Sequence, residues 1–485
     1  MTKSRMAAFG LLCSSPAFAS GHSSQQASDQ NVMAVTPIAA AVSATAQEPG
    51  TGPLTPEARA QALQELQDLR ARMTRLETVL GVPTTPPAEQ VVPPLAKPKS
   101  DHNLELYGFI QLDAIQDFNR VNPDWEATLR PSRIATSPDQ FGSDGQSVFS
   151  VRQSRLGAKA TGTLGGKPYE AKFEFDLYGT GVDAGQTTMR VRHAYASWGP
   201  FLAGQTNSLF MDGDLFPNVI DYWGPAGMVF LRTPQLRWTF WNKGGWKAAV
   251  ALEHATNDID TGNLRLIDES IASNIRNDEK LPDATASVRY EGKWGHVQLS
   301  GILRRLGYET IGTVDSQPRG HKTGWGVDLG SSFNVSLATL RLGAVYGRGI
   351  ASYMNDGGMD FAPNVAVIPP PPPAIGFVLV PSAEAVKLFG MTAYVDFNWS
   401  KQWTTSVGYS YDVVDNTNFQ DATAFHRGQY ASVNLLWHPF DNVFTGGELL
   451  WGKRTDNDGN SGKDVRFQYS VHWDFSSKNL WGLLE

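Results

Sequence analysis

The residues best suited to chemistry in this sequence are basic side chains in segments where polar and apolar residues alternate. Within a segment they are spaced by two or four positions, so they point to the same side of the chain. Arg190 and Arg192 lie two residues apart, and Arg155 and Lys159 lie four apart one hairpin earlier. The same type of position holds further arginines, at Arg237, Arg289, Arg304 and Arg341. A guanidinium group offers a planar fork of N–H donors that matches a carboxylate. A row of such groups on one wall predicts a surface that guides small anions.

Acidic residues on the same faces leave a second interpretation open. The arginines could serve only to form ion pairs, which would give a neutral wall, with the acids Glu105, Asp113, Glu170, Glu174, Asp176 and Glu448. The net charge of −7 does not decide between the two, because many acids fall in the predicted loops.

Catalytic and metal-binding motifs were sought and not found in the sequence. There is no His-Glu-x-x-His, no Gly-x-Ser-x-Gly and no phosphate-binding glycine loop. The single Cys13 excludes a disulfide framework and a cysteine-based zinc site. The histidines of interest fall in separate segments, at His193, His254, His296 and His472. We therefore expect no enzyme, no cofactor and no metal site.

The elements that carry the basic residues have a period of two, which is typical of β-strands with one apolar and one polar face. In 169–178, apolar residues such as Phe173 and Phe175 alternate with Glu170, Lys172, Glu174 and Asp176. Residues 104–114 and 465–475 alternate in the same way. Sixteen such strands are predicted, at 104–118, 149–162, 168–179, 187–198, 201–207, 229–241, 246–255, 283–291, 294–306, 322–334, 338–350, 386–399, 402–412, 426–438, 442–454 and 464–475.

The connections between the predicted strands alternate between long loops and tight turns, which is the pattern of a membrane β-barrel. Tryptophans gather beside the tight turns, as an aromatic girdle at a lipid–water interface requires, at Trp198, Trp241, Trp246, Trp294, Trp399, Trp403 and Trp437. A charge on the lipid face near the midplane costs about 2 to 4 kcal/mol, so the charged face must line the lumen. We predict an all-β, 16-stranded antiparallel transmembrane barrel over 104–475, with outer-membrane lipid around it.

Composition agrees with this fold class. The 485 residues are 18% charged and 41% hydrophobic, with 47 glycines and 11% aromatic residues. No apolar run approaches the roughly 18 residues of a transmembrane helix. The chain has no basic block to neutralise phosphates, so no nucleic-acid partner is expected. A barrel of sixteen strands leaves an aqueous channel, which predicts passive passage of small solutes.

The N-terminal region resembles an export signal followed by a spacer. Residues 1–19 combine Lys3 and Arg5 with a short apolar stretch and end at Ala17-Phe18-Ala19, which predicts a signal peptide. A disordered N-terminus is the alternative. Residues 20–53 are rich in Ala, Ser, Gln and Thr and are predicted to be disordered.

A short coiled-coil helix is predicted over 54–81, before the barrel. Its apolar seam repeats at spacings of three and four, through Leu66, Leu69, Met73, Leu76 and Leu80. So short a coiled coil is stable only within a larger oligomer, and a lone amphipathic helix packed on its own domain is the alternative. A proline-rich linker is predicted over 82–103, and 476–485 form a tail after Phe475, where barrels of this class usually end.

Several dispersed motifs resemble the DcaP-like trimeric porins of Gram-negative bacteria. The similar segments are Gly108-Phe109-Ile110-Gln111-Leu112-Asp113-Ala114, Ser154-Arg155-Leu156-Gly157, Arg190 to Tyr195, Phe201 to Thr206, Gly224 to Arg232 and Val465 to Phe475. The N-terminal coiled coil also matches that family. The resemblance implies a homotrimer in the outer membrane, with the stalk in the periplasm and a channel for small organic anions such as dicarboxylates.

The third long loop, 208–228, is by resemblance to trimeric porins the candidate for a constriction folded into the lumen. Its acids Asp212, Asp214 and Asp221 would then lie opposite the arginines. An outward surface loop is the alternative. Two other functions stay open: a general non-selective porin that also tethers the envelope by contacting the cell wall through its stalk, and a soluble secreted glycan-binding β-protein.

Overall fold

The computed structural model describes residues 64, 67–69, 71–72, 75 and 101–478. The chain divides into two units, 1–94 and 95–485. In the first unit the described residues are helical and exposed, including Leu69. The other predicted stalk residues lie outside the described residues: Leu66, Met73, Leu76 and Leu80. The predicted signal peptide, disordered segment and most of the linker also lie outside them, so the coiled coil stays a prediction.

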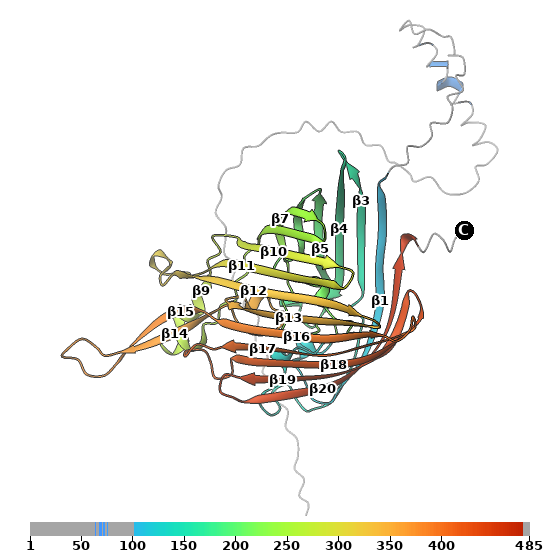
Figure 1. Cartoon of the computed structure of the whole chain (residues 1–485). Coiled ribbons are helices and arrows are strands. Elements are labelled where there is room, and N and C mark those ends of the chain that lie inside the picture. The colour runs from blue at the N-terminus through green and yellow to red at the C-terminus, as the bar shows by residue number, and fades with distance from the viewer. Residues whose placement is uncertain (1–63, 65–66, 70, 73–74, 76–100, 479–485) are drawn as a thin grey trace, which may run out of the picture. The chain divides into compact units, whose positions relative to one another are not determined.

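The second unit is a closed antiparallel barrel of sixteen strands, as the alternation predicts (Figure 1). Each strand pairs with its neighbours, and β1 pairs with β20 over Tyr107–Asp117, which closes the sheet. The strands are β1 (Asn103–Asp117), β3 (Arg155–Leu164), β4 (Lys167–Tyr178), β5 (Thr187–Trp198), β6 (Phe201–Asn207), β7 (Arg232–Lys243), β8 (Trp246–Glu253), β10 (Asp283–Gly292), β11 (Gly295–Thr310), β12 (Gly320–Val335), β13 (Ala338–Arg348), β16 (Lys387–Asn398), β17 (Trp403–Asp415), β18 (Phe425–Phe440), β19 (Val443–Asp456) and β20 (Ser461–Ser476).

The long connections contain the remaining elements. Short strands β2 (Gln146–Ser150) and β9 (Ile275–Asn277) extend the barrel sheet, and β14 (Phe361–Ile368) pairs with β15 (Val378–Ala385) in a hairpin that projects beyond the strand ends in Figure 1. One loop also contains the α-helix α2 (Glu269–Asn274). The 3-10 turns are η1 (Pro123–Trp125), η2 (Pro131–Arg133), η3 (Gly181–Asp183), η4 (Gly213–Leu215), η5 (Gly262–Leu266), η6 (Val314–Ser316) and η7 (Ala351–Tyr353).

Within the described residues, no helix has both the length and the hydrophobicity needed to cross a membrane.

The two faces of each strand differ in the predicted sense. On β4, Phe173 is 50% exposed on the outside, whereas Glu174 and Asp176 are almost fully buried inside. On β20, Val471 is exposed and Arg466 is fully buried. The seven tryptophans beside the tight turns are all between 40% and 55% exposed, on the outer face. The apolar surface therefore covers the exterior, and the polar and charged side chains fill the interior.

The second predicted strand, 149–162, is wrong in its boundaries because the chain leaves the sheet at 151–154. β1 pairs with β3 over its first half and with β2 over its second half. In the gap, the Ser154 hydroxyl accepts a hydrogen bond from the backbone N–H of Gln111 at 3.1 Å. The Gln153 amide donates to the Asp113 carboxylate at 2.9 Å. The break thus turns polar side chains into the lumen.

The start of the tail is bonded to the first strand. Ser476 donates to the Glu105 carboxylate at 2.9 Å, and the Lys478 ammonium lies 2.9 Å from the same carboxylate. Residues 479–485 lie outside the described residues.

Labelling of adjacent residues on β4 tests the assignment of faces. In a Cys13→Ser background, a fluorophore on Phe173→Cys should report hydrocarbon and be quenched by lipid-borne nitroxide. A fluorophore on Lys172→Cys should be quenched by water-soluble iodide, because Lys172 faces the lumen and its side chain is 22% exposed. Fluorescence quenching of the folded protein in liposomes is the measurement. The reverse pattern at these two sites would contradict the assignment.

Candidate functional site

The loop that joins β6 to β7, residues 208–231, folds into the barrel and spans its interior. Near its start, the Asp212 carboxylate lies 2.7 Å from Nε2 of His296 on β11. Further on, the N–H of Asn218 donates to Asp396 on β16 at 3.2 Å, and the N–H of Ile220 donates to Glu448 on β19 at 2.7 Å. The anchors of this loop therefore lie on three separate strands of the barrel wall.

Side chains at and beside the seam between β1 and β20 hold the same loop next to the Glu448 anchor. Gln153 and Gln468 both donate to the carbonyl of Ile220, at 2.9 and 3.1 Å. Arg466 forms a bidentate ion pair with Asp117 across the seam, with N–O distances of 2.7 and 2.6 Å, and both side chains are fully buried. A buried pair of this kind is strongly destabilising to break, because the remaining charge has no partner.

Asp221 anchors the loop through four hydrogen bonds, none of which comes from an arginine. Its carboxylate accepts hydrogen bonds from Thr128 at 2.8 Å, from the N–H groups of Leu129 and Gly224 at 3.1 and 3.2 Å, and from the Tyr430 hydroxyl at 3.2 Å. Burial raises the pKa of Asp221 above its ordinary value. Asp221 is 2% exposed, so its carboxylate joins the loop to the segment after β1.

A cavity of about 1580 Å³ lies beside this loop. Among its lining residues, cationic side chains outnumber acidic ones. The arginines are Arg130, Arg133, Arg155, Arg190, Arg192, Arg232, Arg276 and Arg454, and the acids are Asp221, Asp258, Asp260, Asp356 and Asp421. Three of the eight predicted basic residues, Arg155, Arg190 and Arg192, therefore border this space.

Arg190 and Arg192 share two carboxylates of β4. Arg190 binds Asp176 through two N–O contacts of 3.2 and 2.7 Å. Arg192 lies 2.9 Å from Glu174 and 3.0 Å from Asp176. The register of β4 and β5 shifts at Arg192, where β5 carries one extra residue. This β-bulge lets both guanidinium groups reach the same acids.

Three further cations surround these carboxylates. Arg155 lies 3.6 Å from Glu174, and the Lys172 ammonium lies 3.1 Å from it. Arg232, which was not predicted, packs with its guanidinium 4.8 Å from the Phe230 ring centre. Its Nε atom is buried and has no hydrogen-bond partner among the described residues, and its charge is repelled by those of Arg192, Arg155 and Arg190. We call Arg155, Lys172, Arg190, Arg192 and Arg232 the arginine cluster.

The other predicted basic residues lie elsewhere on the wall. Lys159 lies directly opposite Lys172 in the pairing of β3 with β4. Arg237 donates to Gln235 at 2.9 Å and to the carbonyl of Asn207 at 2.6 Å, without an acidic partner among the described residues.

Three further predicted arginines are held by acids, although not by the acids that the ion-pair interpretation named. Arg289 contacts Asp212, Asp214 and Glu291 at 3.4, 2.6 and 3.1 Å. Arg341 binds Asp396 at 2.7 Å and also donates to the backbone carbonyl of Asp214. Arg304, predicted to line the pore, is fully buried between Asp283 at 2.9 Å and Asp360 at 3.0 Å. It fastens the loop before β14 to the wall.

Sequence reasoning missed the cavity residues that come from loops. Arg130, Arg133, Arg276 and Arg454 fall outside the alternating runs or near strand ends, where parity gives no direction. Arg232 has the parity of the outward residues Leu236 and Trp238, so alternation would place it outside. It reaches the cavity because it is the first residue of β7, directly after the inward-folded loop.

Comparison with known proteins agrees with this architecture. A family model described as DcaP outer membrane protein matches residues 93–348, which is more than half of the chain. The outer membrane channel DcaP of Acinetobacter baumannii aligns with a TM-score of 0.63 and 22% identity over 78% of this chain and 98% of that chain. An anion-selective porin from Comamonas acidovorans aligns with a TM-score of 0.49 and 11% identity over 77% and 100%. A search of curated proteins gave no match.

Replacing Asp356 tests how the loops around the cavity are held. Asp356 is buried and binds Arg130 at 2.8 Å and the N–H of Ser132 at 2.8 Å. Asp356→Ala leaves the Arg130 charge without its partner, so we expect the segment 123–133 to lose about 3 kcal/mol of local stability. Hydrogen exchange of this segment should accelerate accordingly, while exchange in β11 and β18 stays unchanged. Equal protection of 123–133 in both proteins would contradict this role.

The same contact has a defined pH dependence. Burial alone would raise the pKa of Asp356, but the Arg130 charge and the Ser132 hydrogen bonds outweigh burial and hold this pKa below its ordinary value. The stabilisation is therefore complete above the unfolded-state pKa and is lost as pH falls through the folded-state pKa. Protection factors of 123–133, corrected for the intrinsic pH dependence of amide exchange, should fall only in acid, and a fall near neutral pH would contradict the assignment.

Proposed function

The chain belongs to the DcaP outer membrane protein family, and from this premise we propose that its barrel passes small organic anions, such as dicarboxylates, by diffusion. The family and the barrel make the protein an outer-membrane porin and not an enzyme. The preference for anions is a separate claim. It rests on the charge of the lumen wall.

The observation that carries the proposal is the surplus of positive charge in the arginine cluster. Five cationic side chains there face two carboxylates, those of Glu174 and Asp176. Ion pairing with these acids therefore leaves an excess of positive charge. In a narrow site with low-dielectric walls, such an excess raises the local concentration of anions. Guanidinium forks also offer the bidentate geometry that carboxylates prefer.

We also propose that the loop 208–228 forms the constriction. Met211, Gly213 and Phe216 line the cavity, and the loop is anchored on both sides of the lumen. A solute passing the loop at this level meets the arginine cluster on the facing wall. Asp214, with its side chain 65% exposed, is the constriction acid that remains open to the lumen.

Replacing Arg232, which has no carboxylate partner among the described residues, tests the proposal. Arg232→Gln removes one charge without leaving a buried acid unpaired. We expect the flux of a four-carbon dicarboxylate, relative to that of a neutral solute of similar size, to fall about tenfold, because one charge-assisted hydrogen bond contributes roughly 1.5 kcal/mol. Liposome flux of the reconstituted protein is the measurement.

The control is Lys322→Gln. Lys322 is 45% exposed and paired with Glu384, and neither residue lines the cavity, so its replacement should leave the flux ratio unchanged. An unchanged ratio in Arg232→Gln would contradict the role of the cluster and leave a general porin.

We propose that the protein assembles as a homotrimer, because two strands on one side of the barrel are too short to span the apolar layer of the membrane. β6 has seven residues and β8 has eight. At about 3.4 Å per residue and a tilt near 40°, these strands rise about 18 and 21 Å, less than the apolar band of about 25 Å. Protein contact on this side would shield backbone groups that lipid cannot satisfy. The envelope-tether alternative depends on the stalk, which lies largely outside the described residues.

A charge placed on the outer face of β7, between the two short strands, tests this assembly. Leu236 is 64% exposed on the outer face of β7, directly opposite Ala203 of β6. Leu236→Lys should yield monomers by native mass spectrometry, because it places a charge in the subunit contact. Leu449→Lys, on the taller strand β19, should lower refolding yield while the folded protein stays trimeric. Trimers in both variants would contradict the proposed interface.

A further inference from the structure

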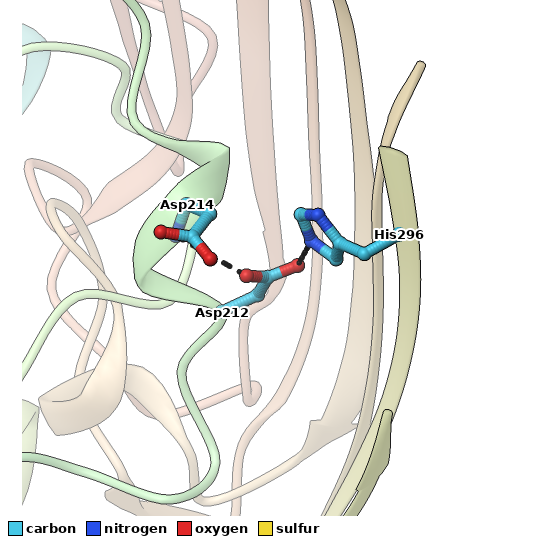
Figure 2. Close-up of side chains that lie close together, drawn as sticks. All are labelled: Asp212, Asp214 and His296. Carbon is cyan, nitrogen blue, oxygen red and sulfur yellow. Dashed lines mark hydrogen bonds and ion pairs between the residues drawn. The ribbon is translucent and has the colours of Figure 1, made fainter. Parts of the chain in front are cut away.

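A cluster of potential metal ligands lies where the constriction loop meets the wall. Asp212 and Asp214 flank the start of η4, and His296 lies near the beginning of β11 (Figure 2). One ligand atom from each residue lies within 4.8 Å of the other two. That spacing suits three ligands around one ion, because metal–ligand distances are about 2.0 to 2.4 Å. The three residues come from segments more than eighty positions apart, which no sequence motif reveals.

The surrounding structure fixes two of the three side chains. The Asp212 carboxylate accepts a hydrogen bond from the N–H of Asp214 at 3.2 Å and lies against Gly330, where an added Cβ would be 2.3 Å from its oxygen. On His296, Nδ1 lies 3.0 Å from the Ser332 hydroxyl. Such a second hydrogen bond orients a metal-binding imidazole and leaves Nε2 as the ligand atom. The exposed Asp214 carboxylate leaves one side of the group open to water.

The local charge balance is negative. The carboxylates of Asp212, Asp214 and Glu291 share Arg289, and Lys247, directly opposite Arg289, adds a second positive charge near Asp214 and Glu291. A fourth carboxylate, Asp328, is 3% exposed, and its charge repels that of Asp212. Among the described residues it has no hydrogen-bond or ion-pair partner. Four carboxylates against two cations leave a negative excess, which is costly for the buried Asp212 and Asp328.

We propose that Asp212, Asp214 and His296 bind a divalent cation of the Zn²⁺ type, with the charge of Asp328 adding to the attraction. One imidazole nitrogen and two carboxylates form the mixed ligand set that Zn²⁺ accepts, with a water in the fourth position. Ca²⁺ and Mg²⁺ prefer oxygen ligands alone. The bound ion cross-links the constriction loop to β11. It also offsets negative charge beside the proposed anion path.

Zinc binding to the untagged, full-length protein in detergent tests the proposal. After treatment with EDTA and dialysis, isothermal titration with ZnCl₂ should show one saturable site per chain. His296→Gln and Asp214→Asn should each weaken this site at least tenfold. The control, Asp474→Asn, alters another lumen pair, in which Asp474 lies 3.1 Å from Nε2 of His472, and should leave binding unchanged.

Two results would overturn the proposal. One is the absence of saturable Zn²⁺ binding in the wild-type protein. The other is equal binding in all four proteins, which would place the metal elsewhere. Asp214 is largely exposed, so Asp214→Asn should fold normally, and heat-dependent mobility on gels checks this for each variant. Zn²⁺ should also slow hydrogen exchange of 208–216 in the wild type and not in His296→Gln; equal slowing in both proteins would count against a cross-link through His296.

Discussion

The structure depends on one constraint: every backbone N–H and C=O group that faces hydrocarbon must pair within the protein. For a sheet, this requires closure, and the pairing of β1 with β20 supplies it. Closure separates a lipid-facing exterior from a wet interior. Only such an interior can hold the Arg466–Asp117 pair at the seam and the acids that anchor the inward loop.

The interior then has to hold many charges without neutralising all of them. At the seam and around Arg304, acids and arginines balance in buried pairs, and these pairs fasten loops to the wall. In the arginine cluster they do not balance, and positive charge remains. Beside His296 the imbalance has the opposite sign. The proposed function and the proposed metal site both follow from these local imbalances.

Most of the fold could be predicted from the sequence, because period-two alternation reports directly which residues face lipid. Phe173 and Glu174 lie on the predicted faces, and the alternation also indicated that Arg190 and Arg192 share one wall. Prediction of the site failed where alternation does not tell which way a side chain points, and where residues far apart in the sequence come together. Arg232 occupies a position that alternation assigns to the outer face, but it follows the inward-folded loop and lines the cavity. Arg304 occupies a position that alternation assigns to the lumen, but a loop covers it and pairs it with Asp360. The grouping of Asp212 with His296 depends on how the loop folds.

The central claim is that the lumen wall carries unneutralised positive charge along the solute path. The zero-current potential of the reconstituted channel across a KCl gradient measures this charge selectivity most directly. The account predicts a potential of the sign set by chloride permeation, which shrinks as ionic strength screens the wall. A potential of zero, or one of the sign set by potassium, would contradict it.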